Sequence, residues 1–586
     1  MKKCSKNLWQ WGLTLAFGLV VFLFWRYRYP HALSYQEQFQ MFLFDGTYLR
    51  EVLSQPGGFA RYVSEFLVQF YNVLLVGALV LAVLYMLLQR LVWRLTTRLS
   101  TRGEGFYYPL SFIPALALWY TMGDESVLLA YAVAVIICLL AMLLWPRNKY
   151  AQLACVLVGV PVVYWLAGPL VWLLTVYVAC RWLLDSSSRV KALVASVLLV
   201  LYTLACIGVS VACTNYPAAT LMTGLFYYRY VQTVTVMMAL TALLCVVVPL
   251  TVRYLPSIQT KTKHTALLTT QVAVLAVLTA VVVPNGFDER KYELIEYDYL
   301  VRLKDWEGVV RKAEQKNPDL PMSVSATNLA LAMTGKLGDR IFDFYQHGHE
   351  GLLPTFERNF TTAQLTGEIY YHLGLVNTAQ RFAFESMECL PDYRKSVRVV
   401  KRLAETNLIN GQYEVARKYL KILEKTVFYR PWAQRMMAML GDENAINRHP
   451  LYGMLRQYRL HDDFLFSERE LDKICGQLFI HNQQNQMAAQ YLLMMPLLDG
   501  DVSRFMNYVQ YVQNRIADNP RHCQEAIAFA FFQQRQNPPQ GLVSPLILQQ
   551  MNDFSRMYSQ DKNSPELSRY KNTVWYYLTG IALNAK

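Results

Sequence analysis

One polar stretch near the amino terminus holds the residue types that can do acid–base chemistry or bind an anion. It covers residues 28–62 and contains the carboxylates of Glu37 and Asp45 and the guanidinium groups of Arg50 and Arg61. A carboxylate can take up or release a proton, and an arginine side chain pairs with anionic oxygens. The same side chains are also typical of a solvated helix face. The pattern by itself leaves both interpretations open.

The apolar residues of this stretch have helical spacing. Phe39, Phe42 and Leu43 would lie on one side of a short helix, which predicts an amphipathic segment in the membrane interface. Residues 56–58 (Pro-Gly-Gly) predict a turn that directs the chain into the next apolar span. The first turns of that span carry the acid Glu65, which we expect to face the headgroup region.

The elements that must position this stretch are membrane spans. A helix needs about 20 apolar residues to cross the hydrocarbon core of a bilayer, and nine runs up to Pro284 approach this length. These runs cover residues 8–27, 66–89, 106–122, 126–145, 151–167, 169–184, 192–212, 232–252 and 265–284. The fifth and sixth runs are short and contain Pro161 and Pro169, so they could be tilted, kinked or partly re-entrant. A water-soluble half follows the break at residues 284–286 (Pro-Asn-Gly).

Charge is unevenly distributed between the two halves. The chain of 586 residues has a formal net charge of +14, and residues 1–284 hold 20 Lys and Arg against 8 Asp and Glu. The basic excess therefore belongs to the loops between spans, where topology rules expect it, and does not indicate a nucleic-acid partner. The ten cysteines include no CxxC pair, so neither a disulfide framework nor a zinc site is expected.

The loop charges also predict an orientation. Loops on the side of the amino terminus hold fifteen of the twenty basic residues of this half, and loops on the opposite side hold five. Positive loops stay in the cytoplasm, so we expect the amino terminus inside and, after nine spans, everything past Pro284 outside. The first span lacks a small-residue cleavage site and is expected to remain as an anchor. The predicted location is the inner membrane of a Gram-negative bacterium, with a periplasmic carboxy-terminal domain.

The second half shows a helical repeat with a period near 35 residues. Equivalent positions fall at residues 309, 344, 379 and 416. Small residues let paired helices approach, and proline ends the second helix of a pair. Residues 285–435 therefore resemble tetratricopeptide (TPR) repeats, and helices without a clear period continue over residues 436–586. Such a solenoid presents a concave surface that binds a protein or peptide, although a rigid spacer would have the same pattern.

A polytopic protein with an acid in the segment after its first span resembles the GT-C glycosyltransferase superfamily. Those enzymes use sugars on polyprenyl-phosphate lipids and keep a catalytic acid in the first outside loop, and some eukaryotic members also carry TPR repeats. The resemblance implies that Glu37 is the first candidate for the catalytic acid and Asp45 the second. It implies roles in binding the substrate, its phosphate or a divalent cation for Arg50, Arg61, Asp124, Glu125 and Arg229. Its sugar-lipid groove would be lined by Tyr216, Phe226, Tyr227, Tyr228 and Tyr230.

The chain departs from the GT-C pattern in two ways. The paired acids of many members are absent, because Glu37 and Asp45 are eight positions apart, and nine spans are fewer than most members have. The outside tyrosines would equally form an interfacial aromatic belt. No phosphate-binding glycine loop and no HExxH motif is present. No cofactor is expected, apart from a divalent cation in the GT-C case.

Over nearly its full length the chain also resembles a family of multi-spanning proteins from Gram-negative anaerobes that has no known activity. The resemblance rests on residues 37–38 (Glu-Gln), 56–58 (Pro-Gly-Gly), 66–70 (Phe-Leu-Val-Gln-Phe), 370–374 (Tyr-Tyr-His-Leu-Gly) and 384–385 (Phe-Glu). The expected fold is all-α, a transmembrane helical bundle followed by an extracytoplasmic α-solenoid. Two functions stay open. One is a non-catalytic envelope protein whose TPR-like domain binds protein or peptide partners. The other is a GT-C-like transferase that uses a polyprenyl-phosphate-linked sugar at the outer face of the membrane.

Overall fold

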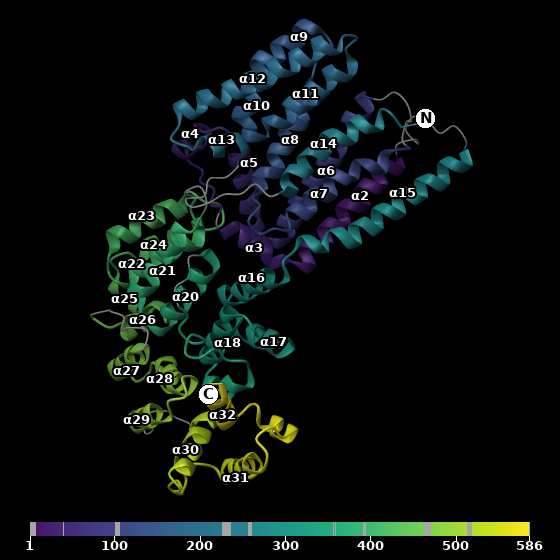
Figure 1. The fold of residues 1–586 in the computed structure, drawn as a ribbon. Coiled ribbons are helices and arrows are strands. Elements are labelled where there is room, and N and C mark those ends of the chain that lie inside the picture. Colours follow the sequence, from purple (N-terminus) through teal and green to yellow (C-terminus); the bar gives the residue numbers. More distant parts are fainter. Residues whose placement is uncertain are drawn as a thin grey trace. The chain divides into compact units, whose positions relative to one another are not determined.

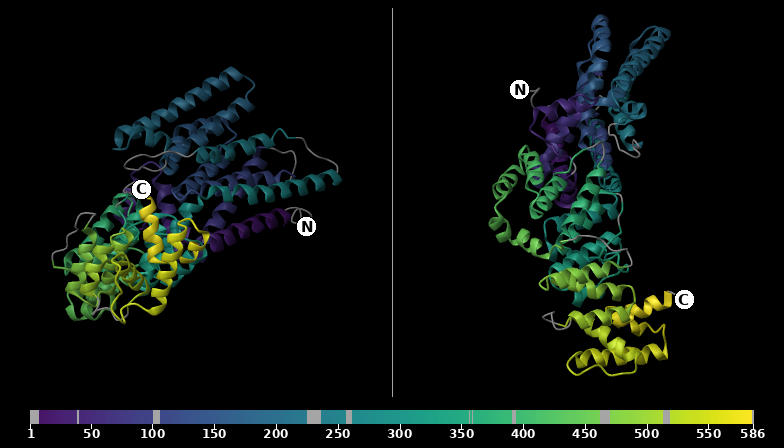
Figure 2. Two further views of the ribbon diagram at one scale, coloured as in Figure 1. Left: turned by 60° about the horizontal axis from the view of Figure 1, so that its bottom comes forward. Right: turned by 90° about the vertical axis from the view of Figure 1, so that its left-hand side faces the viewer.

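The computed structural model describes residues 8–38, 40–99, 106–224, 236–255, 261–355, 357, 359–390, 394–461, 470–512 and 519–584. In these ranges the chain forms helices joined by loops, and no strand is present (Figure 1; Figure 2). The expectation of an all-α protein is confirmed. Long apolar runs favour this outcome because a helix satisfies its backbone hydrogen bonds within one segment.

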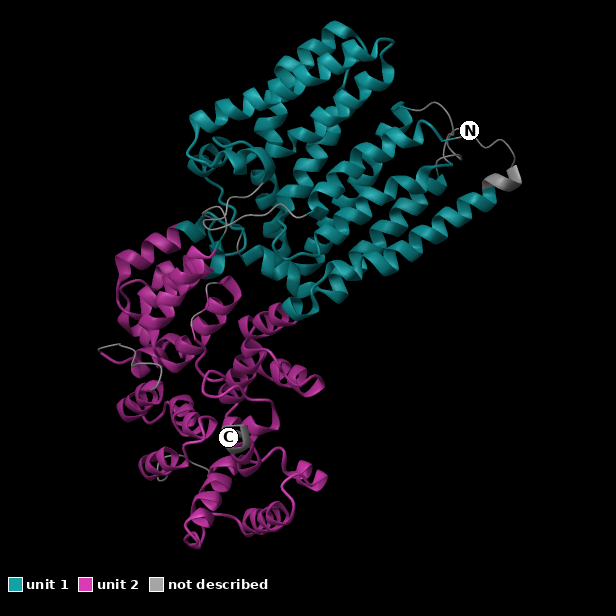
Figure 3. Ribbon diagram, viewed as in Figure 1, with its two compact units in different colours: residues 1–292, 390–398, 422–431 teal, residues 293–389, 399–421, 432–586 magenta. Residues whose placement is uncertain are grey.

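Two compact units make up the structure, and the boundary between them differs from the composition break at Pro284 (Figure 3). Unit 1 contains residues 1–292 together with two short segments of the second half, 390–398 and 422–431. Unit 2 contains residues 293–389, 399–421 and 432–586. The chain therefore comes back to unit 1 twice after leaving it. We call residues 390–398 and 422–431 the return segments.

Unit 1 consists of apolar helices with shorter helices in their connections. Its helices are α2 (Leu8–Leu23), α3 (Pro30–Gln38), α4 (Gly46–Leu53), α5 (Gly58–Val68), α6 (Leu74–Leu99), α7 (Ile113–Thr121), α8 (Leu129–Leu144), α9 (Lys149–Ala154), α10 (Val160–Ala167), α11 (Val171–Asp185), α12 (Arg189–Cys213), α13 (Ala218–Thr223), α14 (Val236–Val252) and α15 (Lys261–Val282). Short helical turns extend or join them at Phe24–Arg28, Gln69–Asn72, Tyr108–Phe112, Cys155–Gly159, Gly168–Leu170 and Pro284–Gly286.

Five helical runs among the described residues are long and apolar enough to cross a membrane. They are Leu8–Arg28, Leu74–Leu99, Lys149–Asp185, Arg189–Cys213 and Thr265–Gly286. Two shorter apolar helices, Leu129–Leu144 and Val236–Val252, lie in the same unit. The chain thus has the helices of a membrane protein. The fifth and sixth predicted spans fall together in the single run Lys149–Asp185, which is interrupted by the turn at Gly168–Leu170.

The second apolar helix begins later than the sequence pattern predicts. Residues 58–68 form α5, and α6 begins only at Leu74, after a turn that holds the polar side chains of Gln69 and Asn72. α5 and α6 are therefore separate elements, joined by the turn Gln69–Asn72 and by Val73 in an extended conformation. The turn predicted at residues 56–58 is present, but it leads into α5 instead of the span itself.

Close backbone packing and stacked rings hold the junction that follows α15. A Cβ atom on Gly286 would lie 2.5 Å from the carbonyl oxygen of Tyr120, and one on Gly123 would lie 2.5 Å from the carbonyl oxygen of Gly286. Phe287 stacks on Tyr29, with ring centroids 4.8 Å apart. These contacts attach the chain that leaves α15 to the end of α7 and to the residues just after the first apolar helix.

The second half of the chain is built from short helices that pack mainly against their sequence neighbours. They are α16 (Glu289–Arg302), α17 (Trp306–Gln315), α18 (Pro321–Met333), α19 (Leu337–Arg340), α20 (Phe360–Leu373), α21 (Val376–Glu388), α22 (Val397–Ile409), α23 (Tyr413–Glu424), α24 (Arg430–Met439), α25 (Glu443–Arg448), α26 (Pro450–Tyr458), α27 (Leu471–His481), α28 (Gln486–Leu498), α29 (Val502–Val512), α30 (Arg521–Gln533), α31 (Pro545–Gln560) and α32 (Val574–Asn584). The pairs α17 and α18, α20 and α21, and α27 and α28 pack against each other.

Three of the four equivalent positions in the repeat fall on buried helix faces. Val309 lies in α17, Ala379 in α21 and Ala416 in α23, and all three are fully buried. The fourth position differs, because Phe344 follows the short turn Ile341–Asp343 and belongs to no helix. The pairing of neighbouring helices is therefore observed, while the assignment of these pairs to the TPR class stays a prediction.

A charged cluster joins the helices α20 and α22 through residues of unit 2. The guanidinium group of Arg402 lies 2.7 Å from Glu368 and 3.2 Å from Glu405, and it covers the ring of Tyr371 at 3.5 Å. His372 is 4% exposed beside this cluster. Burial lowers the pKa of His372 to about 4, because the charged imidazolium form loses its hydration there.

Candidate functional site

Backbone pairing joins the connection between α2 and α6 to the return segments. The N–H of Met41 donates to the carbonyl of Lys395 at 3.1 Å, and the N–H of Phe44 donates to the carbonyl of Lys425 at 2.8 Å. All of these residues belong to unit 1. These main-chain hydrogen bonds satisfy the N–H groups of Met41 and Phe44 with carbonyl groups that are distant along the chain.

The amphipathic helix expected in this connection does not form as predicted. The preceding helix α3 ends at Gln38, and the described residues 40–45 are not helical. Phe42 and Leu43 are buried within the protein, with exposed fractions of 3% and 9%, while Phe39 lies outside the described residues. The apolar side chains that were expected to face the membrane interface therefore pack inside unit 1.

Glu37 is one of the most buried carboxylates of unit 1, with an exposed fraction of 3%. The hydroxyl of Tyr429 in the second return segment donates to its two oxygens at 3.0 and 3.2 Å. The next side chain, Gln38, accepts a hydrogen bond from Nη1 of Arg398 at 3.1 Å. Glu37 thus lies where α3 contacts a residue from the second half of the chain.

Glu65 on α5 forms a second buried charged group with the first return segment. Its oxygen Oε1 is 3.0 Å from Nε of Arg61 and 3.0 Å from Nη1 of Arg394, and its Oε2 accepts a hydrogen bond from the hydroxyl of Tyr48. Glu65 and Arg394 are 1% and 2% exposed at their side chains. Burial, followed by the negative charge of Glu65, raises the pKa of Tyr48 far above its usual range.

Asp45 serves as the N-cap of α4. Its Oδ1 accepts a hydrogen bond from the N–H of Thr47 at 3.0 Å, and its Oδ2 pairs with the ammonium group of Lys425. The hydrogen bond from Lys425 and the capped N–H group together lower the pKa of Asp45 to about 2. Asp45 is therefore a carboxylate anion at any physiological pH.

These elements enclose a pocket of about 410 Å³, which we call the charged pocket. Its charged lining residues are Asp45, Glu51, Arg61, Glu65, Arg394, Lys395 and Lys425. All of them lie in unit 1, and the last three come from the return segments. The tyrosine Tyr216, which follows α12, also lines the pocket. The structure thus gathers four residues named from the sequence, namely Asp45, Arg61, Glu65 and Tyr216. Glu65 is buried in the protein, so the expectation that it faces the headgroup region is wrong.

Other predicted site residues do not line this pocket. Arg50 is exposed on α4, Asp124 accepts hydrogen bonds from Ser126 within its own turn, and Glu125 pairs with Lys291 at 2.6 Å. Arg229 lies outside the described residues, as do the other four residues proposed for the groove: Phe226, Tyr227, Tyr228 and Tyr230.

The two carboxylates that the GT-C resemblance assigned to a divalent cation, Asp124 and Glu125, both have other partners. No group of three or more His, Cys, Asp or Glu residues in the described ranges has the arrangement of a metal site. A hard cation such as Mg²⁺ or Ca²⁺ takes several oxygen ligands, which the single turn of Asp124 and Glu125 does not bring together.

Sequence reasoning missed the contribution of the second half of the chain. Arg394, Lys395, Lys425 and Tyr429 were absent from the predicted site, although they contact its residues. A local signal for the first return segment does exist. Residues 394–398 hold three cations within five positions, in a half whose charges nearly balance. No comparable signal marks Tyr429.

Comparison with known families places the whole chain in one group. The model of a family of unknown function (DUF6057) matches residues 5–581. The chain belongs to this family. No curated protein and no solved structure matches the chain. The matched region therefore includes both units and both return segments. Because the family has no known function, membership of DUF6057 assigns no activity to this chain.

The geometry of this DUF6057 member determines what its charged pocket can do. A general base works best when its pKa is near the working pH. The pKa of Asp45 is about 2, and Glu65 lies between two guanidinium groups. With so low a pKa, Asp45 is a poor proton acceptor near neutral pH. Both carboxylates are suited to holding cationic side chains and to binding a polar ligand through fixed charges.

Proposed function

We propose that this protein is an integral protein of the bacterial inner membrane that organises envelope partners and does not catalyse a reaction. Nine spans anchor it with the amino terminus in the cytoplasm. The TPR-like helices of unit 2 lie in the periplasm and bind a protein or peptide there. Seven apolar helices support the anchor, and the basic excess in alternate loops supports the orientation.

One observation carries the proposal. The two carboxylates that the GT-C resemblance assigns to catalysis, Glu37 and Asp45, are both engaged by the second return segment, through Tyr429 and Lys425. A carboxylate that holds a distant part of its own chain has a structural role. Removing it would loosen the return segment, and in this proposal no reaction depends on it as an acid.

Binding of polypeptide by the full-length protein tests the proposal. The protein in lipid nanodiscs is exposed to a phage library that displays random dodecapeptides, and empty nanodiscs serve as the reference. We expect clones that bind the protein at least 10-fold better than the empty nanodiscs. The Glu37→Gln and Asp45→Asn variants are expected to retain these clones, because neither acid nor its partner belongs to unit 2. Absence of any enriched clone would refute the proposal.

A GT-C-like transferase is the second candidate, and the charged pocket favours it. Asp45, Arg61 and Tyr216 line one pocket, and these residue types could hold the phosphate and sugar of a polyprenyl-phosphate-linked donor. The nanodisc protein is therefore also incubated with a radiolabelled polyprenyl-phosphate-linked hexose and acceptor peptides. Transfer of label that is lost in Glu37→Gln or in Asp45→Asn would establish the transferase in place of the scaffold.

A further inference from the structure

Unit 2 contains a pocket that the charged pocket of unit 1 does not involve. It has a volume of about 490 Å³, and we call it the aromatic pocket. Phe342 and Phe344 are buried and contribute its apolar side, while Tyr345, Tyr576 and Tyr577 contribute further rings. Tyr345 and Tyr576 are 50% and 37% exposed, so two large aromatic side chains stand at the surface next to a cavity.

The polar residues of the aromatic pocket carry an uncompensated positive charge. Asp343 lines the pocket, but Arg340 pairs with it at 3.0 Å and Arg521 approaches it at 3.8 Å. Lys571 also lines the pocket, is exposed, and has no ion-pair partner in the part of the chain that the structure describes. An incoming carboxylate would therefore meet Lys571 without competing with a residue of the protein.

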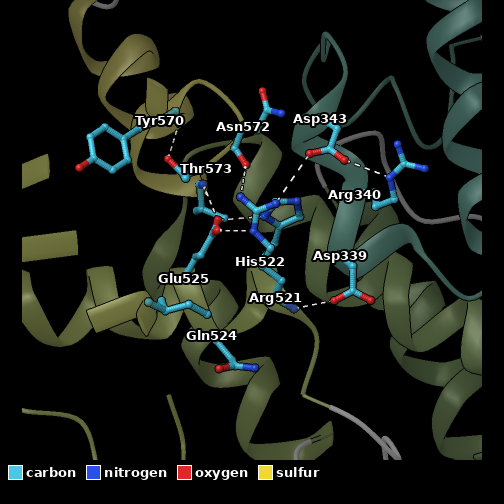
Figure 4. Close-up of polar contacts among 12 residues, drawn as sticks. Asp339, Arg340, Asp343, Arg521, His522, Gln524, Glu525, Tyr570, Asn572 and Thr573 are labelled. Atoms are coloured by element: carbon cyan, nitrogen blue, oxygen red, sulfur yellow. Dashed lines mark hydrogen bonds and ion pairs between the residues drawn. The ribbon is translucent and has the colours of Figure 1, made fainter. Parts of the chain in front are cut away.

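A buried network fixes the chain that leads into the wall of this pocket (Figure 4). The carboxylate of Glu525 on α30 contacts Nδ1 of His522 at 2.9 Å and accepts a hydrogen bond from Nε of Arg521 at 2.8 Å. Its Oε2 also accepts a hydrogen bond at 2.9 Å from the N–H of Val574, the first residue of α32. Glu525 and His522 are completely buried. The start of α32, the helix that carries Tyr576 and Tyr577, is therefore held by a charged group.

Two more hydrogen bonds hold the same wall. Nη2 of Arg521 donates to the carbonyl of Asn572 at 3.1 Å, and the hydroxyl of Tyr577 donates to the carbonyl of Leu498 at 3.0 Å. The aromatic pocket is thus formed before any ligand arrives. A preformed site loses little conformational entropy on binding, which favours affinity.

We propose that the aromatic pocket binds an extended peptide that inserts one large apolar side chain and places an acidic residue next to Lys571. The buried phenylalanine rings offer no hydrogen bond, so the group that reaches them is apolar. The pocket also presents the amide side chains of Asn317 and Asn572, and an amide both donates and accepts hydrogen bonds, as a peptide main chain does. Aromatic anchors dominate many protein interfaces. This inference rests on the proposed binding role of unit 2 and names its site and ligand class.

The inference is tested by measuring how variants of the full-length protein bind the peptides of the phage clones that were enriched on nanodiscs. We expect an apolar residue beside Asp or Glu to recur in the enriched peptides. Synthetic peptides of these sequences should bind Tyr576→Ala at least 10-fold more weakly than the unaltered protein. Lys571→Glu should lose the acidic peptides and gain affinity for the same peptides with Lys in place of the acid. The matched controls Tyr511→Ala and Lys562→Glu change an exposed tyrosine and an exposed lysine outside the pocket, and we expect both to bind normally.

The outcomes separate this inference from the proposed function. If peptides are enriched but bind Tyr576→Ala and Lys571→Glu as tightly as the unaltered protein, the aromatic pocket is not their site and the binding role of the protein still stands. If no peptide is enriched, both fall together. If a glycan array shows ligands that Tyr576→Ala no longer retains, and no peptide is enriched, the ligand class is a carbohydrate and the inference is overturned. Thermal melting of each variant confirms that it is folded.

Discussion

The hydroxyl of Tyr429 donates a hydrogen bond to the carboxylate of Glu37 at 3.0 Å, although 392 positions separate the two residues. The contact places a candidate catalytic acid against a segment that belongs, by sequence, to the other half of the protein. Together with the pair Asp45–Lys425, it shows that the polar stretch after the first apolar helix is part of the tertiary structure of unit 1.

Removing the hydroxyl of Tyr429 should destabilise the protein. In Tyr429→Phe the carboxylate of Glu37 stays buried with one donor fewer, and an under-satisfied buried polar group costs about 1–3 kcal/mol. Equilibrium unfolding in detergent micelles measures the loss of the free energy of unfolding. A double-mutant cycle with Glu37→Gln should show a coupling energy above about 0.5 kcal/mol. Tyr511→Phe, at a tyrosine that is 67% exposed, serves as the control, and equal stability of both tyrosine variants would contradict the contact.

The ion pair between Arg394 and Glu65 should matter far more than a surface pair. Breaking a buried pair from one side leaves an uncompensated charge, so Arg394→Gln is expected to cost about 3 kcal/mol or more of unfolding free energy. The surface pair of Arg381 and Glu385 is 3.7 Å apart with Arg381 61% exposed, and Arg381→Gln should cost less than about 1 kcal/mol. Chemical unfolding of both variants provides the comparison, and similar losses would argue against a buried pair.

His372 should make unit 2 less stable in mild acid. Its pKa is about 4 in the folded protein and about 6.5 when exposed. Between these two pH values the unfolded chain binds more protons than the folded protein. The contribution of His372 to the free energy of unfolding is therefore complete above pH 6.5 and falls as the pH approaches 4. The shift corresponds to about 3 kcal/mol.

Melting temperatures between pH 7 and pH 4 should reveal this effect as a difference between variants. The neighbouring charges of Glu368 and Arg402 remain in His372→Asn, so the variant should lose stability less steeply with falling pH than the unaltered protein does. His481→Asn removes an exposed histidine and should follow the unaltered protein. Parallel curves for all three proteins would show that His372 does not titrate as a buried base.

Substitution by alanine should change the stability of the protein differently at two glycines of unit 1. A methyl group on Gly286 would meet the carbonyl oxygen of Tyr120 at 2.5 Å, whereas one on Gly208 in α12 has nothing within 4 Å. Gly286→Ala should therefore cost about 2 kcal/mol through overpacking, and Gly208→Ala should be neutral or slightly stabilising because alanine favours a helix. Fluorescence-detected size exclusion reports the yield of monodisperse protein, and equal yields would contradict the close approach.

The predicted orientation has a direct test in cells. A fusion of alkaline phosphatase after Lys586 should be active, since the enzyme folds only in an oxidising compartment. The same reporter fused after Asn148, in a loop predicted to be cytoplasmic, should be inactive. A green fluorescent protein, which is dark when exported through the general secretory route, should give the opposite pattern at both positions. An inactive phosphatase and a bright fluorescent fusion at Lys586 would place unit 2 in the cytoplasm.

Helix content could be predicted from the sequence because it depends on neighbouring residues. Each of the nine apolar runs contains at least one described helix, and the helices predicted from spacing around Ala379 and Ala416 are present. The errors arose where the chain changes direction between elements. The turn Gln69–Asn72 separates α5 from α6 inside one predicted span. The described residues 40–45 pair with the return segments through Met41 and Phe44 and are not helical.

The candidate site could be predicted only in part. Asp45 and Arg61, which the chemistry of the polar stretch indicated, and Tyr216, which the GT-C resemblance implied, do line one pocket. Asp124 and Glu125 were also implied by the resemblance, yet each is used by a local turn or an ion pair. A single sequence does not reveal which charged groups have already found a partner, because those partners are distant along the chain.

The sequence by itself determined the all-α class, the apolar helices and the break in composition, since hydrophobic runs and helical periodicity are properties of adjacent residues. Only the tertiary structure decided that the pairs Glu37–Tyr429 and Glu65–Arg394 meet in unit 1. Such contacts follow from how the whole chain buries its apolar surface and compensates its buried charges. No local pattern encodes which of many distant cations or hydroxyl groups a given carboxylate will meet.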